Sequence, residues 1–338
     1  MHRGNRTYTS ILIGRITNAA ILDLYSRRHH VIHGHLARIL RYTLAMAPVA
    51  LRDLSYYSHP FVFFNRQRAD YHVYENFPPV LDRRDVERYA HTSDGSWTRE
   101  LSPAGFVCLA LKDRAYDLRR SPREVQTYPT MYSDPLDFRL VLGSLHTAQM
   151  SVVRVGIDID PFDGRLHCAS YVDYAANHRT PTGDLWCAAN CSFAIVDTAG
   201  FWWFALAFDR PSLITNSVSW DTRPFRSHDK VVPVRYWSRS DRRFLRLSEC
   251  LAYSFKIAKA RTTQAHDLEM IRADASELQM YSTEMLRSVR NEDPGTDVEH
   301  IAQLRHKMDV VLETAGLGGL GVGYFADTFL LANESLIK

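Results

Sequence analysis

The stretch GFVCLAL at residues 105–111 is a short and continuous apolar run. Such a run predicts a strand that is buried on both faces of a sheet. Similar runs follow at residues 150–155, 192–196 and 211–215, and helical patterns separate them. Strands that alternate with helices at this spacing predict βαβ units, and therefore a parallel sheet with helices on both faces.

The helical segments carry their own start signals. Ser133-Asp134-Pro135 sets a capping side chain directly before a proline, which predicts a helix that begins there and ends near Gln149. Further helices are predicted at residues 184–190, 200–208 and 248–259, followed by two in a C-terminal tail. The apolar faces of the tail helices are Leu278, Met285, Leu286 and Val289 in the first, and Val298, Ile301, Met308 and Leu312 in the second.

The composition is that of a globular protein, because 46% of the 338 residues are hydrophobic and 23% are charged. This length predicts about two domains. We place a smaller amino-terminal region, with a helical pattern at 34–54, at residues 1–100. An α/β domain with the helical tail follows at residues 101–338.

Neither a membrane span nor a disulfide framework is predicted. The most apolar stretch, residues 192–208, is broken by Asp197 and Gly200 and is too short to cross a bilayer. No signal-peptide pattern opens the chain, so we expect a cytoplasmic protein. The five scattered cysteines contain no CxxC motif, and we interpret Cys187 and Cys191 as small buried residues.

Positive charge is concentrated at the amino terminus. Residues 1–60 hold eight arginines, no lysine and only Asp23 and Asp53 as acids, a net charge of +6. Such a segment predicts a basic face for a phosphorylated acceptor or for an anionic membrane, at the inner side of which the protein would be peripheral. A metal site at His29 and His33 is a weaker alternative, since no carboxylate lies nearby in sequence.

Polar residues follow the first and third predicted strands, whose carboxyl ends should meet at one ligand-binding edge of the sheet. Lys112 can neutralise a diphosphate, and Asp113 can accept a proton from a hydroxyl. A solvated ion pair at the strand end is the alternative. The turn Asp197-Thr198-Ala199-Gly200 offers backbone N–H groups and a hydroxyl to a phosphate, or serves only as a helix cap. Thr215 ends the fourth predicted strand and Asn216 follows it, which places both at the same edge, where a simple polar turn is the alternative.

Several familiar motifs are absent or misplaced. GxGxxG occurs at residues 316–321, but it follows a helical pattern, so it predicts a helix stop rather than a dinucleotide site. Asp158 and Asp160 form a DxD pattern in a polar loop, which we interpret as a turn. The chain has no GxSxG, HExxH or P-loop, which removes the main support for hydrolase, zincin and P-loop kinase functions.

Residues 107–253 contain a series of short blocks in a particular order. The blocks are Leu111-Lys112-Asp113-Arg114-Ala115-Tyr116, Ser133-Asp134-Pro135, Val152-Val153-Arg154-Val155-Gly156, Asp173-Tyr174, Asp184-Leu185 with Cys191, Thr198-Ala199-Gly200, Pro211 with Thr215-Asn216, and Ser248-Glu249. In this order they resemble a family of bacterial glycosyltransferases found with surface-polysaccharide genes. The layout also resembles the donor domain of GDP-fucose-using fucosyltransferases.

The resemblance implies a GT-B-like fold with a Rossmann-type donor domain. It implies transfer of a sugar from a nucleotide-diphosphate sugar to a hydroxyl of a cell-surface glycan or lipid-linked acceptor, with no obligatory metal or cofactor. Lys112 stands where the family has a diphosphate-binding arginine, and Asp113 is the candidate base. The expected donor-binding residues are Lys112, Tyr116, Arg154, Asp173, Asp197, Thr198, Ala199, Gly200 and Asn216.

Two departures from the family pattern support an alternative function. The family histidine is Ala110 here, and its arginine is Lys112, which keeps the charge but loses the bidentate fork. A catalytically degenerate scaffold that binds a glycan or a partner enzyme is therefore the second hypothesis. Nucleic-acid binding through residues 1–60 is a weaker third. We do not expect it, because no zinc finger, RRM signature or dense lysine run is present.

Overall fold

The computed structural model describes most of the residues from 83 onward. The described residues are 83–112, 114, 118, 132–157, 159, 170–197, 201–218, 220, 226–251, 267–292, 297–315 and 323–337, together with the strands β1 (Ile11–Gly14) and β2 (His30–His33), which pair in parallel. The helix predicted at 34–54 and the patterns at 158–160 and 316–321 are not within the described residues, apart from Ile159.

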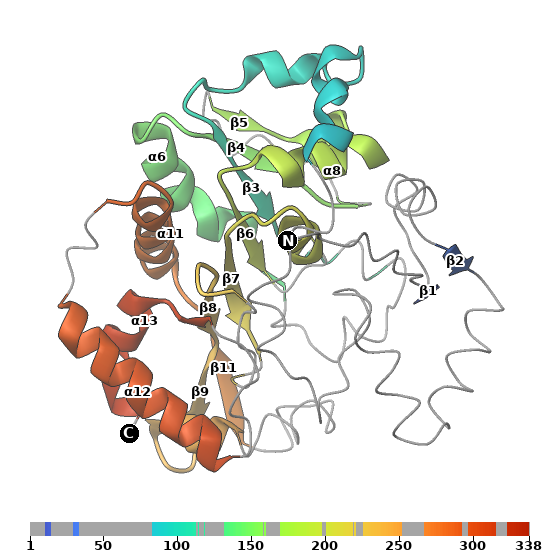
Figure 1. Cartoon of the computed structure of the whole chain (residues 1–338). Coiled ribbons are helices and arrows are strands. Elements are labelled where there is room, and N and C mark those ends of the chain that lie inside the picture. The colour runs from blue at the N-terminus through green and yellow to red at the C-terminus, as the bar shows by residue number, and fades with distance from the viewer. Residues whose placement is uncertain are drawn as a thin grey trace, which may run out of the picture.

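A seven-stranded parallel sheet forms the centre of the described structure (Figure 1). Its strands are β3 (Phe106–Ala110), β4 (Ser151–Arg154), β5 (Tyr171–Val172), β6 (Phe193–Asp197), β7 (Ser212–Ser217), β8 (Lys230–Pro233) and β12 (Tyr324–Phe325). The α/β class and the four predicted strands β3, β4, β6 and β7 are confirmed. The others lacked a local signal, because β5 and β12 have only two residues each and β8 has Lys230 and Pro233 at its ends.

The strand order is β12-β8-β7-β6-β3-β4-β5, so the chain changes direction beside β3. From β3 it proceeds outward through β4 to β5, and it then returns to the opposite side of β3 to add β6, β7 and β8. The strand order therefore reverses between β3 and β6, and the carboxyl ends of these two strands mark the topological switch point of a doubly wound sheet. Sheets of this kind bind ligands outside the carboxyl ends of their strands at that point.

The two faces of the sheet are covered by different helices. Along β3, Val107 and Leu109 belong to one apolar cluster, which includes residues of α6 (Arg139–Thr147) and α11 (Ala275–Val289). Phe106, Cys108 and Ala110 belong to another, formed with α8 (Pro181–Asn190) and α9 (Trp202–Ala207). Figure 1 shows α6 and α11 on one side of the sheet and α8 on the other. Alternate side chains of a strand point to opposite faces, so a wholly apolar strand fits this position.

Most predicted helices form, with shifted ends. The Asp134 carboxylate accepts a hydrogen bond of 2.9 Å from the Leu136 N–H, and the 3₁₀ turn η6 (Pro135–Phe138) leads into α6. α6 ends at Thr147, before the predicted Gln149. The helix predicted to begin at Asp184 begins earlier, at Pro181, because the Thr180 hydroxyl caps the Gly183 N–H. α9 is shorter than the predicted 200–208, and residues 247–251 are helical, which includes the start of the predicted 248–259 segment.

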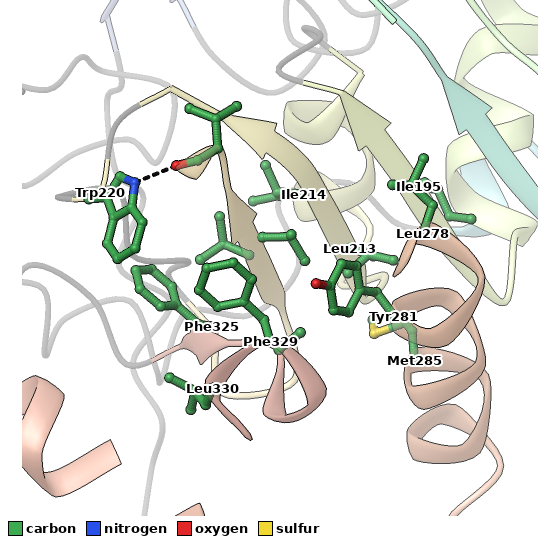
Figure 2. Close-up of a cluster of buried hydrophobic side chains, with 14 of the residues drawn as sticks. Ile195, Leu213, Ile214, Trp220, Leu278, Tyr281, Met285, Phe325, Phe329 and Leu330 are labelled. Carbon is green, nitrogen blue, oxygen red and sulfur yellow. Dashed lines mark hydrogen bonds between the residues drawn. The ribbon is translucent and has the colours of Figure 1, made fainter. Parts of the chain in front are cut away.

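The C-terminal helices close one end of the apolar core. α12 (Val298–Thr314), α13 (Asp327–Ala332) and α14 (Glu334–Ile337) follow α11. The predicted apolar faces of α11 and α12 are confirmed except at Val298, which opens α12 and is 69% exposed. Figure 2 shows Trp220, Phe325 and Phe329 in edge contact, and the Trp220 indole N–H donates to the Val234 carbonyl oxygen at 2.6 Å.

Smaller elements that the sequence did not predict pack around this centre. β9 (Arg235–Ser238) lies between β10 (Arg243–Phe244) and β11 (Leu268–Ile271) in an antiparallel sheet. The 3₁₀ turns at residues 83–100 fall within the predicted amino-terminal region, yet Trp97 lies in the apolar cluster beside α8. The boundary at residue 100 stays a prediction. No helix in the described residues has the length and apolar character to cross a membrane.

Replacing Phe329 by alanine tests the core at the C-terminal end. Phe329 is 1% exposed and contacts Trp220, Phe325 and Tyr281. We expect Phe329→Ala to lower the free energy of unfolding by about 3–5 kcal/mol, because it leaves a cavity among aromatic rings. Urea unfolding measures the change. The control is Leu140→Ala on the surface of α6, where the side chain is 37% exposed, and equal losses in the two variants would contradict this packing.

Candidate functional site

Three of the predicted site residues lie at the carboxyl edge of the sheet, near the switch point. Lys112 follows β3, and Asp197 is the last residue of β6, the neighbouring strand. Thr215 pairs in register with Asp197 across β6 and β7, and Asn216 comes next. The parallel arrangement therefore brings together Lys112, Asp197 and Asn216, as the sequence predicted.

Asp197 is a buried carboxylate. Its residue is 0% exposed, and neither side-chain oxygen makes a close hydrogen bond among the described residues, although the Ser133 hydroxyl and the Lys112 backbone N–H lie near enough to act on it. Burial raises the pKa of Asp197 to about 6, against the opposing effects of the Ser133 hydroxyl and the positive charges of Arg272 and Lys112. A buried ionisable group with a shifted pKa at a ligand-binding edge is a candidate functional group. The Thr215 hydroxyl beside it is also buried and has no hydrogen-bond partner in the described structure.

Asn216 connects three separate elements at this edge. Its backbone has a φ of 53°, in the left-handed region that asparagine adopts more readily than most residues. Its amide nitrogen donates to the Ser133 hydroxyl oxygen at 3.1 Å, and its amide oxygen accepts from the Ala273 N–H at 3.4 Å. The end of β7, the start of η6 and the start of α11 are thereby held together. Asn216 therefore has a structural role at this edge, whatever it contributes to a ligand.

Lys112 lies beside an aromatic ring that sequence reasoning missed. Its ammonium nitrogen is 5.5 Å from the centre of the Tyr132 ring, within the range of a cation–π contact. Arg272, also missed, acts on Asp197 through its positive charge. Neither residue could be predicted from the local sequence, because both lie far along the chain from the ends of β3 and β6. Lys112 and Arg272 face two carboxylates, because Arg272 also pairs with Asp137 at 3.0 Å, so the described cluster has no net charge when both aspartates are ionised.

Arg154 and Asp173 lie on the opposite side of β3 from Asp197. Arg154 ends β4, and its guanidinium donates to the Asp173 carboxylate at 3.1 Å, with both side chains largely buried. Asp173 also caps α7 (Tyr174–Asn177) through the Ala176 N–H. Because the two charges neutralise each other, the pair adds little net charge to the edge. Their predicted contact with a donor stays a prediction.

Five predicted site residues cannot be placed. Asp113, Tyr116, Thr198, Ala199 and Gly200 lie outside the described residues. Ala110 is 1% exposed and lies in the apolar cluster with α8 and α9. Within the described parts of the chain, no group of three or more His, Cys, Asp or Glu side chains is arranged to hold a metal ion.

Comparison of the chain with protein-family models, curated proteins and solved structures finds no match.

The opposite edge of the sheet offers a matched control for Asp197. Asp229 immediately precedes β8 and is 1% exposed, and it accepts a hydrogen bond of 2.8 Å from the Ser212 N–H at the start of β7. Burial raises its pKa to about 7, against the effects of that N–H and of Arg226. Asp229 thus resembles Asp197 in burial and titration, but it lies at the amino edge, away from the switch point.

The shifted pKa of Asp197 predicts a pH-dependent stability. An aspartate in the unfolded chain has a pKa of about 3.9, so the fold favours the neutral carboxyl. Wild type is therefore expected to lose stability relative to Asp197→Asn as the pH rises from about 4 to above 6, by about 3 kcal/mol at most. Urea unfolding at several pH values measures this difference. Parallel curves for the two proteins would show that Asp197 does not titrate in this range.

Proposed function

We propose that this protein is a glycosyltransferase that binds a nucleotide-diphosphate sugar at the carboxyl edge between β3 and β6. The observation that carries this proposal is the buried Asp197 carboxyl at the switch point, with the positive charges of Lys112 and Arg272 acting on it. The strand order supports a nucleotide at this position, since doubly wound sheets bind such ligands there. The specific choice of a sugar donor rests on the sequence resemblance.

Glycosyl transfer makes two chemical demands on such a site. The acceptor hydroxyl oxygen forms a bond to the anomeric carbon while the bond from that carbon to the diphosphate breaks. The diphosphate leaves with the electron pair, and the hydroxyl proton passes to a base. Lys112 stabilises the charge that develops on the leaving diphosphate. Asp113, the next residue in the chain, is the proposed base.

The acceptor is proposed to be a hydroxyl of a cell-surface glycan or a lipid-linked sugar. The basic residues 1–60 are proposed to contact that acceptor or an anionic membrane. No nucleic acid is expected as a partner.

A catalytically inactive scaffold is the second candidate function. It is favoured by Ala110, which occupies the position of the family histidine and is buried among apolar side chains. An alanine there donates no hydrogen bond to a diphosphate. Such a protein would retain nucleotide or glycan binding without transfer of the sugar.

A thermal-shift panel tests the donor site. UDP, GDP, CMP and their sugar conjugates are added to wild type, Lys112→Ala and the control Asp229→Asn. A nucleotide at 100 times its Kd should stabilise wild type by about 2.7 kcal/mol. We expect one nucleoside diphosphate to do so, Lys112→Ala to lose the effect, and Asp229→Asn to retain it. If no nucleotide stabilises wild type, the donor site proposed here is wrong, whereas binding without sugar turnover favours the scaffold.

Transfer is also expected to be independent of a divalent cation, because Lys112 can balance the diphosphate charge. Turnover of the donor that binds is measured before and after treatment with EDTA. Unchanged activity is the expected result. Complete loss of activity that Mn²⁺ or Mg²⁺ restores would contradict this part of the mechanism.

A further inference from the structure

Arg272 holds the segment that leads into η6 at two points. One of its terminal nitrogens donates to the Tyr132 carbonyl oxygen, and the other donates to the Asp137 carboxylate at 3.0 Å. Arg272 follows β11 and precedes α11, so it approaches η6 from a part of the chain 140 residues away from Tyr132. Because its planar fork reaches both groups at once, it fixes the position of this segment better than a single contact would.

A second connection secures the same segment. Ser133, the neighbour of Tyr132, accepts a hydrogen bond from the Asn216 side chain at the end of β7. Asn216 in turn accepts one from the Ala273 N–H, next to Arg272. Tyr132 is 9% exposed, so the packing around it also limits its movement. The backbone at Tyr132 is thus held from β7 and from the start of α11.

The Tyr132 ring extends this arrangement to Lys112. The Lys112 ammonium lies 5.5 Å from the ring centre. A lysine side chain has several rotatable bonds, and fixing it for a ligand loses much conformational freedom. An aromatic ring that already attracts the ammonium reduces this loss before the ligand binds. The order of contacts is therefore Asp137 to Arg272, Arg272 to Tyr132, and Tyr132 to Lys112.

We propose that Tyr132 and Arg272 are positioning residues of the donor site. Arg272 holds Tyr132, and the Tyr132 ring holds the Lys112 ammonium where it meets the diphosphate of the donor. The Arg272 guanidinium is itself engaged by Asp137 and the Tyr132 carbonyl, so it acts through Tyr132. This role rests on the proposed function, since it requires that Lys112 binds a nucleoside diphosphate.

Substitution of Tyr132 tests the role of the ring. We expect Tyr132→Leu to weaken the binding of UDP or GDP by about 3- to 30-fold, the range of a partly buried cation–π contact. Tyr132→Phe keeps the ring and should retain most of the affinity. The control is Tyr324→Leu, which removes a ring 5.0 Å from the Arg305 guanidinium at the far strand β12 and should leave the affinity unchanged. Isothermal titration calorimetry measures the Kd of each variant for both nucleotides.

Substitution of Arg272 tests the link to Tyr132. Arg272→Lys keeps the charge but cannot reach two acceptors in the same way, so we expect it to weaken nucleotide binding to a similar extent as Tyr132→Leu. The matched control is Arg290→Lys at the other end of α11, where a guanidinium nitrogen donates to the Ala148 carbonyl oxygen at 2.9 Å. That variant should bind the nucleotide as wild type does.

A double-mutant cycle separates positioning from general damage to the fold. If Tyr132 acts through Lys112, adding Tyr132→Leu to Lys112→Ala should cause no further loss of nucleotide affinity. The same cycle on urea unfolding of the unliganded protein should show that the two residues interact. Additive effects in the unfolding cycle, or full affinity in Tyr132→Leu, would overturn the positioning role even if Lys112→Ala abolishes binding. If wild type binds neither UDP nor GDP, the proposed function fails, and with it any role of the two residues at a donor site.

Discussion

The central position of β3 determines the arrangement of the whole described structure. β3 pairs with β4 on one side and with β6 on the other, and helices cover both of its faces. No part of this strand can therefore carry a polar side chain without a high desolvation penalty. Polar chemistry is confined to its ends, and the change of chain direction at β3 makes its carboxyl end the topological switch point, where doubly wound sheets bind ligands.

Two buried aspartates with raised pKa values lie at opposite edges of this sheet, and their positions suggest different roles. Asp197 and Asp229 are both almost fully buried, and burial raises the pKa of each. Asp229 bonds to the first N–H of β7, and this contact explains its presence at the amino edge. Asp197 is acted on instead by the Ser133 hydroxyl, the Lys112 backbone N–H and the charges of Arg272 and Lys112, and it lies at the switch point. Position at the switch point, rather than burial or a raised pKa, is therefore what distinguishes Asp197 from Asp229.

The cysteines give a simpler outcome. Cys108 on β3, Cys187 on α8 and Cys191 directly after α8 are each 0% exposed, and burial contributes to raising the pKa of each thiol. The main cause at Cys191 is its hydrogen bond with Cys108. Thiols with raised pKa values in an apolar cluster are poor nucleophiles and poor metal ligands. The interpretation of Cys187 and Cys191 as small buried residues is confirmed, and the contacts among the three add packing between β3 and α8.

The sequence by itself determined the elements with strong local signals. Continuous apolar runs specified β3, β4, β6 and β7, a cap followed by proline specified the start at Asp134, and the residues after the strands specified Lys112, Asp197 and Asn216 as edge residues. Only the tertiary structure decided the two-residue strands β5 and β12, the burial of Asp197 and the link from Arg272 through Tyr132 to Lys112. The physical reason is the separation in sequence between the groups that interact. A helix cap or an apolar strand is an interaction between near neighbours in the chain, whereas the desolvation of a carboxylate and a contact across 140 residues exist only once the sheet and helices have packed.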